Sequence, residues 1–214
     1  MPKLRTDSWT LQPKLNPDMR TTDFHYELPP ELIASRPLVD RESSRMMLVN
    51  RATSEISHHR FSDFADLLPP DHLLVLNDTK VIPARLFSND GKIELVRTNA
   101  PDPNHWWCLV RPGKKMRDGR SVEVGKSTGT VIQTNDKGER LIKWNTPPDL
   151  EVHGHLALPH YMEREPDKSD RDRYQTVYAK EEGAIAAPTA GLHFTPDLLS
   201  KLDHTFLTLH VGVG

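Results

Sequence analysis

Residues that could bind a ligand or take part in catalysis gather in the stretch from Tyr174 to Leu199. His193 stands between a run of small uncharged residues, 183–191, and a helix start at Thr195-Pro196-Asp197. That start has a hydroxyl N-cap, a proline at the first helical position and an acid in the first turn. Glycines allow close backbone approach, and a helix N-terminus offers free N–H donors. The pattern predicts an anion or nucleotide pocket beside an imidazole. Tight packing of the loop is the alternative.

Two further groups could line such a pocket. Asn77-Asp78-Thr79 ends an apolar strand expected at 73–76, where polar side chains hold a ligand or bond their own turn. In a strand expected at 205–211, alternation places Leu207, Leu209 and Val211 on one face and His210 on the other. We expect no metal site. His58 and His59 are adjacent and point to opposite faces, and no Cys or carboxylate supports His153, His155 and His160.

Composition limits the class of protein. The chain has 214 residues, 36% of them apolar, with 18 prolines, which favours a β-rich, loop-rich architecture. The single cysteine, Cys108, excludes an internal disulfide and a Cys-based zinc site, and suits a reducing cytosol, so we expect a cytoplasmic protein. No membrane-spanning run or signal-peptide core is present. The net charge of -2 gives no global sign of nucleic-acid binding.

Several elements must position these groups. Residues 1–22 are expected to form a flexible leader. Alternation at Phe24, Tyr26 and Leu28 predicts a half-buried strand, and Pro29-Pro30-Glu31 opens a helical turn through Ala34. Other expected elements are a buried-type strand at 46–49, a strand at 55–61, a helical turn at 63–68, a short β-leaning run at 174–178 and a helix at 196–202.

Between Arg85 and Ala157 the pattern changes to short β-type runs separated by turns, which predicts a small antiparallel barrel. The runs cover residues 92–97, 106–110, 121–124, 129–133 and 141–144. This region holds 12 Lys or Arg against 9 Asp or Glu, a local net charge of +3. Its densest basic loop follows Trp106 and Trp107, and basic loops beside aromatics suit phosphate contact and base stacking. A solvated hairpin is the alternative. The loop's basic residues are Arg111, Lys114, Lys115, Arg117 and Arg120.

Four segments of the chain follow one another as they do in a known family: the opening block 23–49, then 77–86, 174–199 and 208–214. On these segments the chain resembles the S-adenosylmethionine:tRNA ribosyltransferase-isomerase family of queuosine biosynthesis. The resemblance implies a mixed α/β, barrel-like domain that is discontinuous and carries an inserted β-barrel. It places the first domain at 23–84 and 158–214 and the insert at 85–157.

The reaction that the resemblance implies moves the ribosyl part of S-adenosylmethionine to a 7-aminomethyl-7-deazaguanine base in tRNA. The sugar is rearranged to give epoxyqueuosine, and adenine and methionine are released. S-adenosylmethionine is then a co-substrate, no cofactor is permanently bound, and we expect a monomer. A base must remove the proton beside the sulfonium, and neutral imidazole suits that task.

The implied roles fall on matching residues. His193 and His210 are the candidate imidazoles, Asp78 is expected to face the sulfonium, and Tyr174 or Tyr178 to stack on adenine. For each histidine, a buried imidazole bonded to backbone is the alternative. The other expected substrate contacts are Arg45, Asn77, Thr79, Arg85, Gln175, Thr189, Gly191 and Thr195.

The resemblance covers nearly all of this chain but about two-thirds of a family member, so we expect the C-terminal third to be missing. This leaves a second hypothesis, a shortened, non-catalytic RNA-binding homologue. The expectation is that a complete chain consumes S-adenosylmethionine and that the 214-residue form is much weaker.

Overall fold

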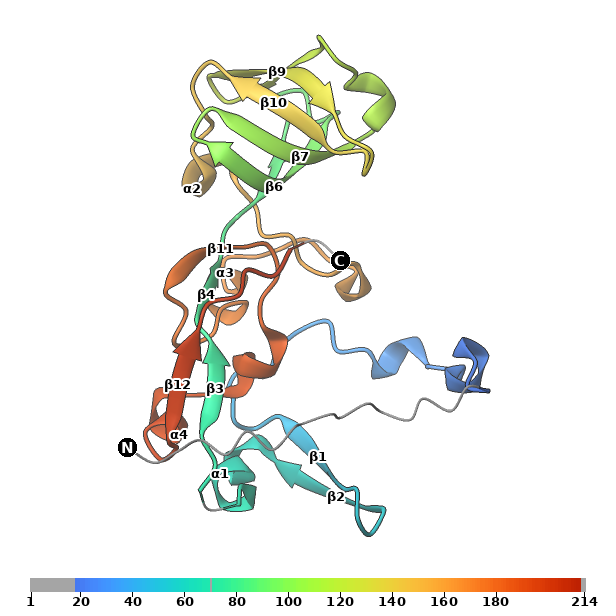
Figure 1. The fold of residues 1–214 in the computed structure, drawn as a ribbon, viewed down its shortest axis with the longest axis vertical. Helices are drawn as coiled ribbons and strands as arrows, with labels where there is room; N and C mark the ends of the chain where they lie inside the picture. The colour runs from blue at the N-terminus through green and yellow to red at the C-terminus, as the bar shows by residue number, and fades with distance from the viewer. Residues whose placement is uncertain (1–17, 70, 213–214) are drawn as a thin grey trace, which may run out of the picture. The chain divides into compact units, whose positions relative to one another are not determined.

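The computed structural model describes residues 18–69 and 71–212, and the chain divides after Ala34 into two compact units (Figure 1). The described part of the first unit, residues 18–34, contains two 3-10 turns, η1 (Thr21–Phe24) and η2 (Pro30–Leu32). The second turn confirms the helical turn expected at Pro30. Residues 1–17 of the expected leader lie outside the described residues.

The strand predicted at Phe24, Tyr26 and Leu28 is wrong. Phe24 ends η1, and the Phe24 and Tyr26 side chains are 65% and 70% exposed. The Asp23 carboxylate accepts a hydrogen bond from the Arg20 backbone N–H at 2.9 Å, which favours a turn. No described strand pairs with this segment, so its alternation has no sheet to face.

A six-stranded antiparallel sheet, nearly closed into a barrel, dominates the second unit (Figure 1). Asn89, which follows the first strand, closes the gap to the last. Its backbone N–H donates to Glu123 O at 2.9 Å, and its amide bonds both backbone groups of Gly125. The sheet is antiparallel and barrel-like, as the sequence predicts for this region. The strands, in sheet order, are β5 (Arg85–Phe87), β6 (Glu94–Asp102), β7 (His105–Arg111), β10 (Arg140–Trp144), β9 (Ser127–Thr134) and β8 (Ser121–Val124).

The barrel interior is filled by alternate residues of its strands. Leu95 of β6 and Ile142 of β10 are fully buried, as is Cys108 of β7. Trp106 packs inside against Trp144, with ring centroids 5.5 Å apart. Trp106, one of the two aromatic residues that precede the basic loop, is therefore not available for base stacking, because the strand's alternation turns it inward.

Among its described residues, the rest of the second unit has three two-stranded sheets. One is an antiparallel hairpin of β1 (Arg45–Asn50) and β2 (Glu55–Arg60). The others are parallel pairs, β3 (Leu74–Asn77) with β12 (His204–Leu207), and β4 (Thr79–Val81) with β11 (Glu181–Ala184). In Figure 1, each parallel pair lies side by side although its strands are far apart in sequence.

Three strand predictions in this region need correction. The strand expected at 205–211 ends at Leu207, the last residue of β12, so His210 lies beyond the strand. The run at 46–49 does form a strand, but it is not buried, since Met47 is 60% exposed and no third described strand joins its hairpin. The run at 174–178 is not a strand; the strand lies at β11 instead. The Gln175 side chain occupies the ladder position, accepting from Val81 N at 3.0 Å and donating to Val81 O at 2.7 Å.

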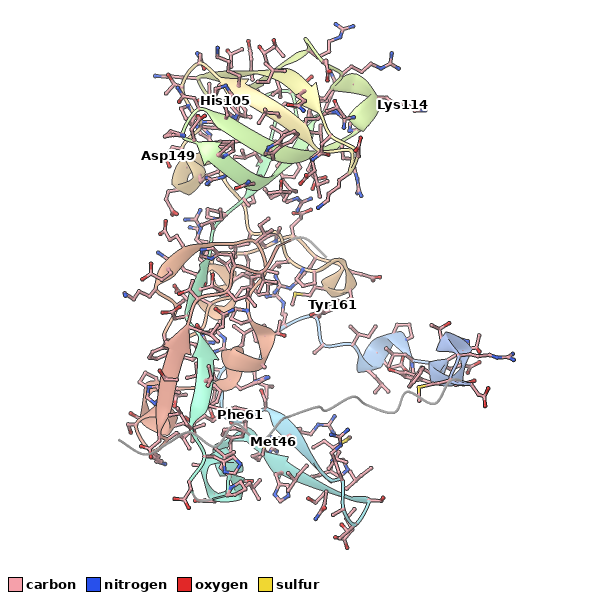
Figure 2. All side chains as sticks on the ribbon, viewed as in Figure 1. Met46, Phe61, His105, Lys114, Asp149 and Tyr161 are labelled. Atoms are coloured by element: carbon pink, nitrogen blue, oxygen red, sulfur yellow. The ribbon has the colours of Figure 1, made fainter. Side chains whose placement is uncertain are left out.

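The helical segments of the second unit are short. Phe61, which is labelled in Figure 2, packs with Leu76 and Phe194 in a buried cluster with Leu198 and Leu199. The helical segments are η3 (Phe61–Asp63), α1 (Phe64–Leu67), η4 (Gly113–Lys115), α2 (Leu150–His153), η5 (His160–Met162), α3 (Asp170–Arg173), η6 (Thr189–His193) and α4 (Pro196–Leu199). In the part of the chain that the structure describes, no helix has the length and apolar character to cross a membrane.

Candidate active site

The ends of β3 and β12 are joined by the side chains of Asn77 and Asp78. The Asn77 amide donates to Leu209 O at 2.8 Å and accepts from Leu209 N at 3.0 Å. The Asp78 carboxylate accepts from the Thr208 hydroxyl at 2.7 Å. Two sequence motifs separated by about 130 residues thus meet through bonds that substitute for a strand ladder.

His210 is held beside this junction. Its Nδ1 lies 2.7 Å from the hydroxyl of Thr79, a fully buried residue of β4. The imidazole rests against the backbone of Gly183 in β11, where an added Cβ would come within 2.8 Å of the ring. Gly183 also has φ +151°, which disfavours other residues. The ring is therefore fixed in orientation while His210 as a residue stays exposed.

His193, the last residue of η6, lies in a different setting. Its ring centroid is 5.1 Å from that of Phe61. Burial lowers the pKa of His193, and the nearby charges of Arg173 and Arg41 lower it further. The imidazole is therefore neutral at neutral pH, which is the form able to accept a proton.

The helix start at Thr195 is as the sequence predicts. The Thr195 hydroxyl caps α4 by accepting from Leu198 N at 3.1 Å. The same hydroxyl donates to the carboxylate of Glu42. An anion from the chain itself therefore already contacts the group that the sequence assigned to a ligand.

The two candidate tyrosines, Tyr174 and Tyr178, differ in how deeply they are buried. Tyr174 is buried with Val81 and Ala187, and burial raises its pKa. Tyr178 is partly buried and packs against Phe206, with ring centroids 5.5 Å apart. The Tyr178 hydroxyl lies so close to Gly191 that a Cβ there would come within 2.2 Å of it. Tyr178 thus connects the β12 side of the site with the η6 side.

A cleft of about 840 Å³ adjoins Tyr174, between β5–β7 and the segment around Glu165. Arg85 and Tyr174 line it, whereas His193, His210 and Asp78 do not. The Arg85 guanidinium bonds Glu94 at 2.7 Å and Glu165 at 3.0 Å. This predicted substrate contact is therefore already paired with two carboxylates.

Two other predicted substrate contacts, Arg45 and Thr189, are exposed. The five basic residues of the basic loop, which starts at Arg111 at the end of β7, are exposed too, and within the described residues their side chains form no ion pair; Lys114 is labelled in Figure 2. Among the described residues, no group of three or more His, Cys, Asp or Glu side chains is placed to hold a metal ion. The side chain of His160 lies outside the described residues.

Sequence reasoning missed Arg41, Glu42 and Arg173, which surround His193 and Thr195. Arg173 directly precedes the Tyr174 motif, so its position was a usable signal. Arg41 and Glu42 carry no such signal, because a loop without periodicity says nothing about its long-range contacts.

The fold and site define a mixed α/β protein in which imidazole, hydroxyl and carboxamide groups gather at the ends of parallel strands. The chain belongs to the queuosine biosynthesis protein family, whose model matches residues 21–214.

The chain is also similar to curated proteins that carry an enzyme name. The chain is 43% identical over 211 residues to an S-adenosylmethionine:tRNA ribosyltransferase-isomerase of Clostridioides difficile, covering 92% of this chain and 61% of that protein. It is 44% identical, with the same coverage, to the enzyme of that name from Halothermothrix orenii. A crystal structure of S-adenosylmethionine tRNA ribosyltransferase from Thermotoga maritima is 32% identical, with a TM-score of 0.36, over 88% of this chain and 58% of that one. The chain thus spans about 61% of the length of these curated relatives.

Proposed function

We propose that the chain acts in the transfer and isomerisation of the ribosyl group of S-adenosylmethionine onto 7-aminomethyl-7-deazaguanine in tRNA, giving epoxyqueuosine, adenine and methionine. The supporting observation is His193, a part-buried imidazole whose pKa is lowered by burial and by two arginines. A sulfonium acidifies the neighbouring C–H group, and a neutral imidazole is suited to remove that proton.

His210 is the second imidazole of the proposal. Because Thr79 holds its Nδ1, the Nε2 edge is oriented by the protein and can deliver a proton to departing adenine. Asp78 supplies negative charge near the sulfonium, and its bond to Thr208 fixes the carboxylate. Tyr178 is the better candidate of the two tyrosines for stacking on adenine, because Tyr174 is buried in the core.

The remaining predicted contacts serve two purposes. Asn77, Thr79 and Gln175 hold the strand ends, and their bonds support the pocket wall. Arg45, Arg85, Thr189, Gly191 and Thr195 remain proposed substrate contacts. We also propose that residues 85–157 are an insert into a domain built from 23–84 and 158–214, and that the protein is a cytoplasmic monomer.

The basic loop is the proposed contact for tRNA. Its charged side chains are exposed and free of ion pairs among the described residues, so phosphate contact displaces only water and counterions. Replacing Lys114 and Lys115 together by alanine should weaken RNA binding and reduce its salt slope by about two. Lys126→Ala, an exposed lysine on another barrel turn, is the matched control.

Adenine release tests the reaction. Chromatography of the 214-residue chain incubated with S-adenosylmethionine should show adenine only when RNA carrying 7-aminomethyl-7-deazaguanine is present. Adenine release without that base would contradict the proposed acceptor. RNA binding without any adenine release, by the 214-residue chain and by a complete chain alike, would instead favour the second candidate, a non-catalytic RNA-binding homologue, for which the exposed basic loop is the observation.

A further inference from the structure

The guanidinium of Arg41 joins two parts of the site. Its Nη1 donates to Leu192 O at 2.7 Å, and its Nη2 donates to Asp172 O at 2.8 Å. These carbonyls belong to the residues that directly precede His193 and Arg173. Arg41 therefore brings the Arg173 and His193 segments to one place.

Arg173 contributes a second guanidinium with an unused donor. Its Nη2 donates to Leu38 O at 2.7 Å, while its Nε is buried and has no hydrogen-bond partner. A buried N–H without a partner costs free energy that a bound acceptor would recover.

The positive charge of this pair is not neutralised by a bonded carboxylate. Within the described residues, both guanidinium groups donate only to backbone carbonyls. Two acids act on the pair without a hydrogen bond to it. Asp172 raises the pKa of Arg41, and Asp40, whose carboxylate is held mainly by Ser43, has its pKa lowered in part by Arg173. Burial and Arg173 together lower the pKa of Arg41, as expected for crowded cations.

We propose that Arg41 and Arg173 bind the carboxylate at the amino-acid end of S-adenosylmethionine; this rests on the proposed function. The carboxylate is separated from the sulfonium by a short carbon chain. If His193 removes a proton beside the sulfonium, the carboxylate falls within reach of the arginines next to His193. Guanidinium groups match carboxylate geometry, and the negative charge of Asp172, which acts on Arg41, would favour the substrate's ammonium group.

Binding measurements with two ligands test this. S-adenosylmethionine and its decarboxylated form share the adenosine, the sulfonium and the amine and differ only in the carboxylate. The unaltered chain should bind the first roughly ten- to a hundredfold more tightly by calorimetry. Arg173→Ala should reduce this ratio to near one, and Arg173→Lys should retain part of it. Arg171→Ala, on the same helix but bonded to Glu151, should leave the ratio unchanged.

The ratio is taken within each variant, so partial unfolding affects both ligands equally. Equal binding of the two ligands by the unaltered chain, or an unchanged ratio in Arg173→Ala, would overturn the carboxylate site while leaving the proposed function in place. Loss of affinity for an RNA stem–loop in Arg173→Ala, with the ligand ratio unchanged, would assign the pair to RNA phosphate and also overturn it. Failure to bind either ligand would reject the proposed function and this inference together.

Discussion

The barrel-like sheet and the three small sheets of the second unit are stabilised in different ways. In the barrel, six strands share one ladder, and their inward residues form a continuous core around Leu95 and Trp144. In the other region each sheet has two strands, and apolar residues such as Val75 and Leu209 remain exposed. Long-range side-chain bonds, including those of Asn77 and Gln175, complete the ladders there.

The difference indicates where function can be placed. A region held by side-chain-to-backbone bonds presents carboxamide, hydroxyl and imidazole groups at its strand ends. In the nearly closed barrel, by contrast, the backbone N–H and C=O groups of neighbouring strands bond one another. The candidate catalytic residues lie in the first kind of region. The barrel offers the basic loop at its edge.

The largest expected effect on stability is in the barrel core. Leu95→Ala should lower the free energy of unfolding by about 2–5 kcal/mol, because the side chain is 0% exposed and leaves a cavity. Ile132→Ala, at a 47% exposed position of β9, is the control and should cost far less. Urea titration followed by tryptophan fluorescence measures both. Equal costs would show that the barrel core is not the main source of stability.

A smaller and more local effect is expected at the strand junction. Asn77→Ala removes both bonds to Leu209 and should cost about 1–2 kcal/mol. Asn77→Asp keeps the acceptor for Leu209 N and should lose less. Hydrogen exchange should quicken at the Leu209 amide in the alanine variant and leave β7 protected. Unchanged exchange at Leu209 would refute the idea that this side chain holds β12.

The smallest effect is a pH dependence from His193. Its folded pKa lies below the ordinary value of 6.5, so near and below that pH the unfolded chain binds more protons. Above about pH 6.5, His193 is neutral in both states and does not reduce the free energy of unfolding. As the pH falls below 6.5, the unfolded chain takes up the proton first, so the free energy of unfolding declines, and the decline ends below the folded pKa. His193→Gln should remove this decline, while His58→Gln, on an exposed strand, serves as the control. NMR titration of His193 should give a midpoint below 6.5, and a midpoint above it would reverse the sign.

The same contrast explains what the sequence could predict. The barrel strands follow from local alternation and turns, because neighbouring strands such as β6 and β7 are joined by short connections. The strand at β11 was missed because Glu181-Glu182-Gly183 has little strand propensity and depends on its parallel partner β4. The site motifs were located by resemblance. The Arg41–Arg173 pair was not, since it arises from backbone carbonyls that no sequence pattern reveals.

The proposed role of His193 as the base is tested most directly by the rate of adenine release. In the complete protein, with S-adenosylmethionine and RNA carrying 7-aminomethyl-7-deazaguanine, His193→Ala should lower that rate by roughly a hundredfold or more, with little loss of folding. His58→Ala should match the unaltered chain. A His193→Ala variant that releases adenine at the unaltered rate would remove His193 from the reaction.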